Sequence, residues 1–380
     1  MARYVNLMAG DVAPDFEQRS LTNPNYAFGS AAGRYLVMCF FASADDPHSQ
    51  AAFKAALQRT DLFDDDFACF FGVTINPQDE DPKRLKERYP GYRFFLDFDL
   101  NISRRYGVVD AEASELPPPQ EVRRLWVVID PTLRVMKVIT FKPDQSDIAE
   151  LLDYMDALPP PVRFSGLELQ APIIVLPNVF EKELCDHLIS LYEADGGEET
   201  GFMQDVDGKT VGVIDRSHKS RRDYLIQDEA LIKRLQGRII RRVVPEIAKI
   251  HQFHVTRMER YIVSCYSEED GGHFRPHRDN TTKGTAHRRF AVSINLNDEF
   301  DGGEVSFPEY GTRSFKAPPG GAVIFSCSLL HAVSVVTRGR RYAFLPFLYD
   351  DAAAEIRMEN NKHLGHNVSA YNEAAASQQS

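Results

Sequence analysis

The segment HFRPHRD, residues 273–279, constrains this chain more than any other. His277 and Asp279 are two positions apart, so on a β-strand both side chains point to the same face and could bind one metal ion together. A third ligand is available in His331, which follows the apolar run GGAVIFSCSLL. That run predicts a strand that returns His331 to the side of the pair. Two imidazoles and one carboxylate would then hold a metal from one side and leave its other positions open.

Two further residues support a metal site with an acidic ligand. Arg341 lies ten positions after His331, in HAVSVVTRGRRYAF. On the strand after the distal histidine, its guanidinium could make a bidentate contact with a carboxylate, such as the far end of a metal-bound 2-oxo diacid. Tyr266 precedes the pair, in CYSEEDGGHF. Two histidines and one carboxylate are the ligand set typical of non-haem Fe(II) oxygenases.

A family resemblance extends this pattern over roughly residues 170–350. Its motifs are CY…GGHFRPH-R-DN, RRFAVSINLND, FDGGEVSF and PPGGAVIFSCSLLHAVSVVTRGRRYAF. In this order and at these spacings they closely resemble the Fe(II)/2-oxoglutarate dioxygenases of the prolyl-4-hydroxylase type. The resemblance implies a mainly-β double-stranded β-helix, a jelly roll with supporting helices whose mouth holds the iron.

The resemblance also implies roles for particular residues. His277, Asp279 and His331 would be the catalytic Fe(II) ligands. Arg341 would pair with the distal carboxylate of 2-oxoglutarate, and Tyr266 would hydrogen-bond the same cosubstrate from the opposite wall of the pocket. The expected reaction consumes O₂ and 2-oxoglutarate, hydroxylates a C–H bond and releases succinate and CO₂. Ascorbate is a further expected reductant.

One departure from the family concerns the second polar contact to the cosubstrate. Some animal relatives have a tyrosine where this chain has Asn295, so that contact is in question. Arg288 precedes the strand FAVSINLN, and an arginine at this point contacts substrate in some relatives, so Arg288 is a candidate substrate-binding residue. The substrate itself stays open among a prolyl residue of a protein, a free amino acid and a small metabolite.

Bulk properties predict two domains in a reducing compartment. With 380 residues, the chain exceeds the size at which one hydrophobic core stops growing. Its apolar runs are shorter than the ~18 residues that a membrane helix needs, and its start lacks the pattern of a secretory signal. Five widely spaced cysteines argue against a disulfide framework, so we expect a cytoplasmic protein. A net charge of −11 disfavours nucleic acid as a partner.

The first 157 residues alternate strand-like and helix-like segments, which predicts an α/β unit. The predicted strands are YLVMCFFAS, FACFFGVTI, YRFFLDF and RLWVVIDP, and the predicted helices are SQAAFKAALQRT and PKRLKERY. With GDVAPDF near the start and RRLWVVIDPTLRVMKVI near the end, this half resembles thioredoxin-fold peroxiredoxins of the AhpC/TSA type.

The peroxidase chemistry of that family needs a low-pKa cysteine at the start of the first long helix. The equivalent segment here is FFASADDPHSQAAF, in which Ser49, with His48 as the alternative, occupies the nucleophile's position. Cys39 and Cys69 fall within predicted strands and should be buried. We therefore expect a redox-inactive domain that serves packing, homodimer formation or partner binding. For the whole chain, the alternatives to a dioxygenase are a thiol peroxidase or redox-sensing protein, and a non-catalytic dimeric scaffold.

The remaining boundaries follow from composition. Prolines in residues 158–171 predict a semi-rigid linker. The dioxygenase domain should then comprise residues 172–350. Residues 351–380 should form a loose C-terminal tail. The polar stretch around residues 200–225 should be a surface loop with a short hairpin, and whether it covers the substrate is open. From Asp228 to about Gln252 the apolar spacing predicts helix, with Pro245 bending or ending its first part.

Overall fold

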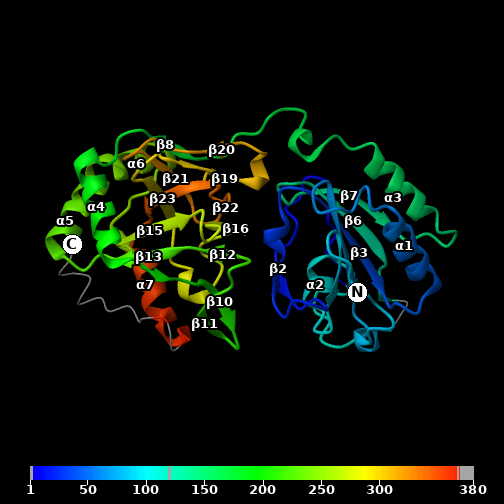
Figure 1. Ribbon diagram of the computed structural model, residues 1–380. Helices are drawn as coiled ribbons and strands as arrows, with labels where there is room; N and C mark the ends of the chain where they lie inside the picture. Colours follow the sequence, from blue (N-terminus) through cyan, green and yellow to red (C-terminus); the bar gives the residue numbers. More distant parts are fainter. Residues whose placement is uncertain (1–2, 119–120, 366–367, 369–380) are drawn as a thin grey trace. The chain divides into compact units, whose positions relative to one another are not determined.

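A computed structural model describes residues 3–118, 121–365 and 368 (Figure 1). The chain divides into two compact units. The first comprises Met1–Gln170 with Pro308–Thr312, and the second comprises Ala171–Phe307 with Arg313–Ser380. Short 3-10 turns connect regular elements in both, namely η1 (Phe28–Ala31), η2 (Pro77–Glu80), η4 (Pro161–Arg163), η5 (Lys283–Thr285), η6 (Pro308–Tyr310) and η7 (Asn361–His363).

The described part of the N-terminal unit contains a mixed five-stranded sheet in the order β5-β4-β3-β6-β7. Its strands are β3 (Tyr35–Ala42), β4 (Ala68–Thr74), β5 (Tyr92–Leu96), β6 (Leu125–Ile129) and β7 (Val135–Thr140). The first three are parallel to one another, and β6 and β7 are antiparallel to their neighbours. A two-stranded ribbon of β1 (Glu17–Gln18) and β2 (Tyr26–Ala27) lies outside this sheet.

Helices cover both faces of this sheet, which explains why its central strands are apolar throughout. Helices α1 (Pro47–Gln58) and α3 (Ser146–Asp156) contribute Phe53 and Leu151 to the same core as the side chains that alternate along β3. On the other face, Phe40 packs against Tyr106, which directly follows α2 (Asn101–Arg105). The α/β thioredoxin-like fold predicted for this half is confirmed.

One predicted helix of this unit is wrong. The segment PKRLKERY, residues 82–89, forms turns rather than a helix. A helix this short is marginal unless packing supports it, and here only Leu85 is buried. Arg84 instead extends to Asp79 and Asp45, so its ion pairs hold the turn in place of helical hydrogen bonds.

The described part of the C-terminal unit is built on two antiparallel sheets. The larger one has the path β14-β24-β17-β23-β15-β13-β9, with β18, β21 and β8 attached at its side, and the smaller one has the order β12-β16-β22-β19-β20. The strands of the larger sheet are β8 (Ile174–Leu176), β9 (Glu198–Glu199), β13 (Arg222–Leu225), β14 (Arg257–Glu259), β15 (Ile262–Ser267), β17 (Phe290–Asn295), β18 (Phe300–Asp301), β21 (Ala322–Ser326), β23 (Arg338–Phe344) and β24 (Phe347–Tyr349). Those of the smaller are β12 (Lys219–Ser220), β16 (His273–His277), β19 (Val305–Ser306), β20 (Ser314–Phe315) and β22 (His331–Val333). This is the β-rich jelly-roll architecture that the sequence predicted.

Three helices support the larger sheet from outside, as Figure 1 shows for this unit. They are α4 (Lys182–Asp195), α5 (Glu229–Arg242) and α6 (Val244–His251). Leu188 of α4 and Leu235 of α5 are fully buried against sheet residues such as Val263. The predicted helix break is confirmed, because α5 ends at Arg242 and Pro245 stands in the first turn of α6.

A hairpin forms within the polar stretch after α4, as predicted. Its strands are β10 (Phe202–Val206) and β11 (Lys209–Val213). The two linking residues, Asp207 and Gly208, both have positive φ, at 50° and 75°, which is typical of a tight type I′ turn. Thr210 of this hairpin accepts a hydrogen bond from the backbone N–H of Gly284 at 2.8 Å, so the hairpin is anchored to η5.

The expectation of a loose tail after Asp350 is wrong for its first part. Helix α7 (Asp351–Asn360) follows directly, and the carboxylate of Asp350 caps it by accepting from the backbone N–H of Ala353 at 3.0 Å. Ala353 and Ala354 are buried, and Arg357 forms an ion pair with Glu259 at 2.7 Å. Small residues let the helix pack closely, which the polar composition of this segment did not indicate. The final residues, 369–380, lie outside the described part of the chain.

Candidate metal and cosubstrate site

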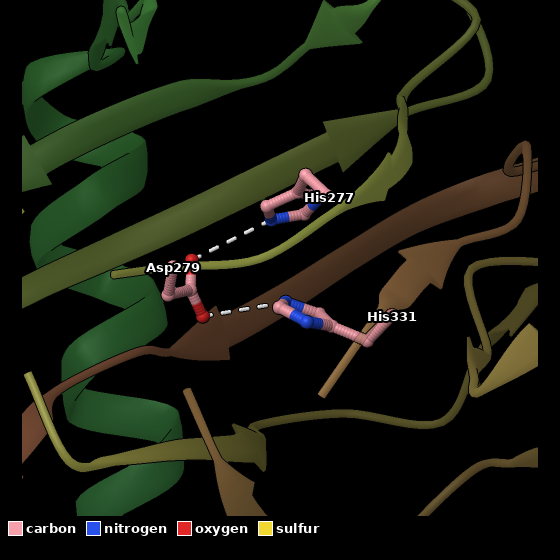
Figure 2. A group of neighbouring side chains, drawn as sticks. All are labelled: His277, Asp279 and His331. Carbon is pink, nitrogen blue, oxygen red and sulfur yellow. Dashed lines mark ion pairs between the residues drawn. The ribbon is translucent and has the colours of Figure 1, made fainter. Parts of the chain in front are cut away.

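The three predicted ligands converge at the pairing of β16 and β22. His277 ends β16, His331 begins β22, and the two are direct partners in the antiparallel register. Asp279 lies just beyond β16 and its backbone N–H donates to the carbonyl of Cys327 at 2.9 Å. One nitrogen or oxygen of each residue lies within 4.8 Å of the others, close enough to share one ion (Figure 2).

The backbone fixes the orientation of both imidazoles. The Nδ1 atom of His277 lies 2.7 Å from the carbonyl of Arg275, and that of His331 lies 3.0 Å from the carbonyl of Leu329. A carbonyl can only accept, so each Nδ1 carries a proton and Nε2 is the atom of each ring that is placed to bind a metal. Figure 2 shows both rings turned toward Asp279. The Nε2 atoms of His277 and His331 lie 3.5 Å and 3.3 Å from its carboxylate. Such fixed rings are typical of metal-binding histidines.

The protonation states suit a metal. Burial, together with the neighbouring His277, lowers the pKa of His331 to about 4, so this imidazole is neutral near pH 7. Burial alone would raise the pKa of Asp279, but the two imidazoles and Arg288 hold it well below its usual range. A neutral imidazole and an ionised carboxylate are the forms that bind metal.

The structure corrects how His331 arrives there. The run GGAVIFSCSLLHAV is two strands, not one, because β21 belongs to the larger sheet and β22 to the smaller. Residues 327–330 carry the chain from one sheet to the other. Buried residues on both sides of this crossing gave the sequence a continuous apolar character, which hid the break.

Arg341 lies at the centre of β23 and is only 2% exposed. Its Nε donates to Oδ1 of Asn295 at 3.0 Å and its Nη2 donates to Oγ of Ser293 at 2.7 Å. Nη1 is buried and has no hydrogen-bond partner among the residues that the structure describes. Arg341 lines the same cavity as His277, Asp279 and His331, so a charged donor there is left for a ligand.

Asn295 and Tyr266, both beside Arg341, make contacts that the sequence did not predict. Asn295 donates its Nδ2 to the carbonyl of Ala317 at 2.8 Å, so its amide is fixed and orients Arg341. Tyr266 is the direct cross-strand partner of Arg341, with the guanidinium 5.2 Å from its ring centroid. It therefore stands next to Arg341 rather than on an opposite wall. Its hydroxyl accepts a hydrogen bond from Nη1 of Arg221 at 3.2 Å.

Glycines allow this close packing at two positions. A Cβ on Gly272 would lie 2.6 Å from the backbone nitrogen of Ser267, so only glycine lets the chain entering β16 cross the end of β15. Gly303 has a φ of +68°, and a Cβ there would lie 3.0 Å from Cδ of Arg341. Bulk at either position would displace the cavity wall.

Arg288, the candidate substrate contact, is engaged elsewhere. Its Nε donates to Glu259 at 2.8 Å, and its guanidinium lies 4.1 Å from the ring centroid of Phe347. It does not line the cavity, although it donates to the backbone carbonyl of Asp279 at 3.4 Å. The geometry makes it a support of the ligand loop.

The sequence did not single out Arg221 and Arg260, which line the cavity, or Asp223, which lies 2.7 Å from the first and 3.7 Å from the second. Arg221 donates to Asp223 through Nη2 at 2.7 Å, and both are largely buried. A signal existed in KSRRD, since Lys219, Arg221 and Asp223 alternate and so share one face of an extended strand.

The N-terminal unit has no thiol at the start of α1. Ser49 is fully buried there, and its Oγ lies 3.3 Å from both the carbonyl of Phe41 and the carboxylate of Asp46. Asp46 also caps α1 and accepts from Arg124 at 2.6 Å. Next to Ser49, His48 faces the fully buried Asp147 at 3.0 Å. Cys39 and Cys69 are buried as expected, and burial raises the pKa of both thiols.

Among the described residues, no helix is both long enough and apolar enough to cross a membrane.

Comparisons with known proteins agree with this division. Residues 256–349 match the family model of the 2OG-Fe(II) oxygenase superfamily, and residues 9–138 match that of the AhpC/TSA family. A PKHD-type hydroxylase of Shewanella sp. (strain MR-7) is 26% identical over 188 residues, which cover 46% of this chain and 77% of the relative. A second PKHD-type hydroxylase, of Maricaulis maris (strain MCS10), is 28% identical over 175 residues, or 45% of this chain and 74% of the relative.

Two solved structures are similar to parts of this chain. A prolyl hydroxylase from Trichoplax adhaerens, in complex with a hypoxia inducible factor peptide fragment, covers 57% of this chain and 96% of its own, with a TM-score of 0.40 and 16% identity. Peroxidoxin BcpB from Mycobacterium tuberculosis covers 40% of this chain and 99% of its own, with a TM-score of 0.34 and 23% identity.

Proposed function

We propose that this chain is an Fe(II)- and 2-oxoglutarate-dependent dioxygenase that hydroxylates a C–H bond, in the manner of prolyl 4-hydroxylases. Its sequence carries a 2OG-Fe(II) oxygenase domain, which follows an AhpC/TSA family domain along the chain. The observation that carries this proposal is Nη1 of Arg341, which has no hydrogen-bond partner within the described ranges and shares one cavity with the three clustered ligand side chains.

The ligand set fits ferrous iron. His277 and His331 would bind through Nε2, since their Nδ1 atoms face backbone carbonyls, and Asp279 would bind through its carboxylate. Imidazole and carboxylate ligands on one side of the ion leave positions for a chelating cosubstrate and O₂. When bound, the ion with 2-oxoglutarate and O₂ would supply the oxidising chemistry, with succinate and CO₂ as coproducts.

The protein's own contribution is to position the cosubstrate and exclude water. Arg341 is held by Ser293 and Asn295 through two of its nitrogens, which leaves Nη1 to meet the distal carboxylate. Tyr266 would add its hydroxyl from the neighbouring strand. Apolar side chains, among them Val305, Phe325 and Val333, line part of the cavity, and the guanidinium of Arg341 is itself 2% exposed, which strengthens its contact with a bound carboxylate.

The decisive experiment measures succinate formed from 2-oxoglutarate by the full chain with Fe(II), without an added primary substrate. Oxygenases of this class are expected to decarboxylate the cosubstrate slowly in that state. Addition of ascorbate tests whether a reductant sustains the turnover. Stimulation by a panel of proline-rich peptides, free amino acids and small metabolites then identifies the class of primary substrate.

For the N-terminal unit we propose a structural or partner-binding role, including homodimer formation. The proposal is supported by the buried serine at the start of α1 and by the ion pair that neutralises Arg124. Light scattering of the full chain in solution would measure its oligomeric state. We also propose a reducing compartment such as the cytoplasm, because all five cysteines are free and buried.

A further inference from the structure

Arg260 is a cavity residue whose charge the proposed chemistry leaves unused. It lies between β14 and β15 and faces the same cavity as His277, Asp279 and Arg341. Its φ is +65°, a left-handed conformation that a non-glycine residue rarely adopts. Strained backbone of this kind persists where the surrounding structure imposes it, and it often marks a functional site. Paired strands on both sides supply that restraint here, at Glu259 and Ile262.

The guanidinium of Arg260 is weakly held. Among the described residues its partners are the carboxylate of Asp223, 3.7 Å away, and the ring of Phe347, whose centroid is 5.2 Å away. Arg221, by contrast, reaches Asp223 at 2.7 Å through both Nε and Nη2. Asp223 also accepts from Thr200 and Ser264, each at 2.6 Å. The carboxylate is thus already occupied, and Arg260 retains free donors.

The charges around the cavity leave Arg260 unbalanced. Arg221 and Asp223 cancel each other. Lys219 is buried, and burial together with Arg221 lowers its pKa to about 6, so it is mainly neutral near pH 7. Burial and the same neighbour lower the pKa of Arg260 only to about 10, so it stays charged. With the cosubstrate in place, the positive charges of Fe(II) and Arg341 would cancel the negative charges of Asp279 and the doubly charged 2-oxoglutarate. The positive charge of Arg260 is then left without a counter-charge.

We propose that Arg260 binds a carboxylate of the primary substrate, so that the substrate of this oxygenase is a carboxylate-bearing molecule. The inference rests on the proposed function, since the charge count includes its cosubstrate. A free amino acid and the terminal or side-chain carboxylate of a peptide are two sources of the same group. A guanidinium without a tight internal partner suits either, because its fork of donors matches the two carboxylate oxygens.

The test measures binding and so does not depend on turnover. The full chain is loaded with Mn(II) and 2-oxoglutarate. Calorimetry then measures the affinity of the twenty free amino acids, of their α-amides, and of one proline-containing peptide with a free or amidated C-terminus. We expect at least one carboxylate probe to bind about tenfold or more tightly than its amide, which is the effect of one good charged contact. Which probe binds shows the source of the carboxylate.

Variants assign the preference to Arg260. Arg260→Gln should remove the preference for acid over amide while 2-oxoglutarate affinity stays unchanged, and Arg260→Lys should keep part of it. Arg257→Gln is the matched control, because Arg257 lies on β14 outside the cavity and binds Asp351 at 2.7 Å. It should leave the preference intact.

Two outcomes would overturn the inference. One is that no carboxylate probe binds the wild-type protein better than its amide, a result that needs no folded variant. The other is that the preference survives in Arg260→Gln. Succinate formation is measured separately. Binding that prefers the acid, without succinate formation, would refute the proposed oxygenase activity but not the carboxylate site. Succinate formation without a preference for the acid would refute the carboxylate site but not the oxygenase activity.

Discussion

The start of α1 and the pairing of β16 with β22 differ in whether their buried polar groups find partners within the protein. At the start of α1, Asp46 satisfies both the helix terminus and Arg124. At the β16–β22 pairing, three ligand atoms lie close together, and one buried donor of Arg341 has no partner in the described part of the chain. Leaving a buried donor unpaired costs stability unless a ligand meets it.

This contrast shows that a domain can be explained by its packing alone or only together with a bound ligand. The N-terminal sheet has an apolar core of strands and covering helices, and a buried serine stands at the start of α1. Packing therefore suffices to explain that domain. Packing does not explain why the buried Arg341 and His331 lie beside the partly buried His277 and Asp279. The following predictions either break this contrast or make it quantitative.

The largest effect is expected for His331→Ala. Removal of one of three ligands should reduce bound iron at micromolar Fe(II) to background, and succinate formation should fall with it. Metal analysis of the purified variant measures this. His273→Ala is the control, since the ring nitrogens of His273 face the carbonyls of Gly271 and Ser217. Full retention of iron in His331→Ala would show that His331 is not a ligand.

A smaller effect is expected for Arg341→Lys, which keeps the charge but loses the fork of donors. Contacts of this kind contribute about 1.5–3 kcal/mol, so the KM for 2-oxoglutarate should rise roughly ten- to a hundredfold. Iron affinity should barely change. Arg340→Lys is the matched control, because the Arg340 side chain is 45% exposed and pairs with Glu269 at 3.2 Å. If neither variant changed the KM for 2-oxoglutarate, the cosubstrate would be held elsewhere.

Tyr266→Phe should have a milder effect on the same parameter. It removes a hydroxyl that accepts from Arg221 and that we propose contacts 2-oxoglutarate. Loss of one hydrogen bond corresponds to about 0.5–1.5 kcal/mol, so the KM should rise roughly two- to tenfold. Steady-state kinetics with varied 2-oxoglutarate measures it. An unchanged KM would restrict Tyr266 to holding Arg221.

Ser49→Cys probes the other half of the contrast. A thiolate at this position would lie against the carboxylate of Asp46, which raises its pKa, and Arg124 is already paired. The variant should therefore consume hydrogen peroxide no faster than an unactivated thiol. Adding Asp46→Asn frees Arg124, and the double variant should react faster. Rapid peroxide consumption by the single variant would show that the site is still activated.

The smallest effect is expected for Ser49→Ala. Its hydrogen bonds are long, at 3.3 Å, and no proposed step of the oxygenase uses them. Succinate formation should be unchanged, and stability should fall by about 1 kcal/mol at most. If activity fell strongly while the variant remained folded, the N-terminal unit would take part in the chemistry.

The sequence predicted much of the fold and site because those features are local or periodic. Buried central strands such as β3 appear as continuous apolar runs, and the period of a strand places His277 and Asp279 on one side of the chain. The helix break at Pro245 follows from the missing N–H of proline. These signals need no knowledge of what packs against them.

The features that the sequence missed depend on contacts between distant segments. The register of β15 against β23 decides that Tyr266 adjoins Arg341, and nothing near either residue specifies it. Whether an arginine is neutralised depends on carboxylates far along the chain, as Glu259 shows for Arg288. The left-handed turn at Arg260 is likewise imposed by the strands on either side.

The most direct test of the central claim is the stoichiometry of 2-oxoglutarate turnover by the full chain. With Fe(II) present, we predict one succinate formed for each 2-oxoglutarate and O₂ consumed, with loss of the activity on chelation and in His331→Ala. Iron bound in the wild type without any succinate above the chelated control, across the substrate panel, would contradict the account.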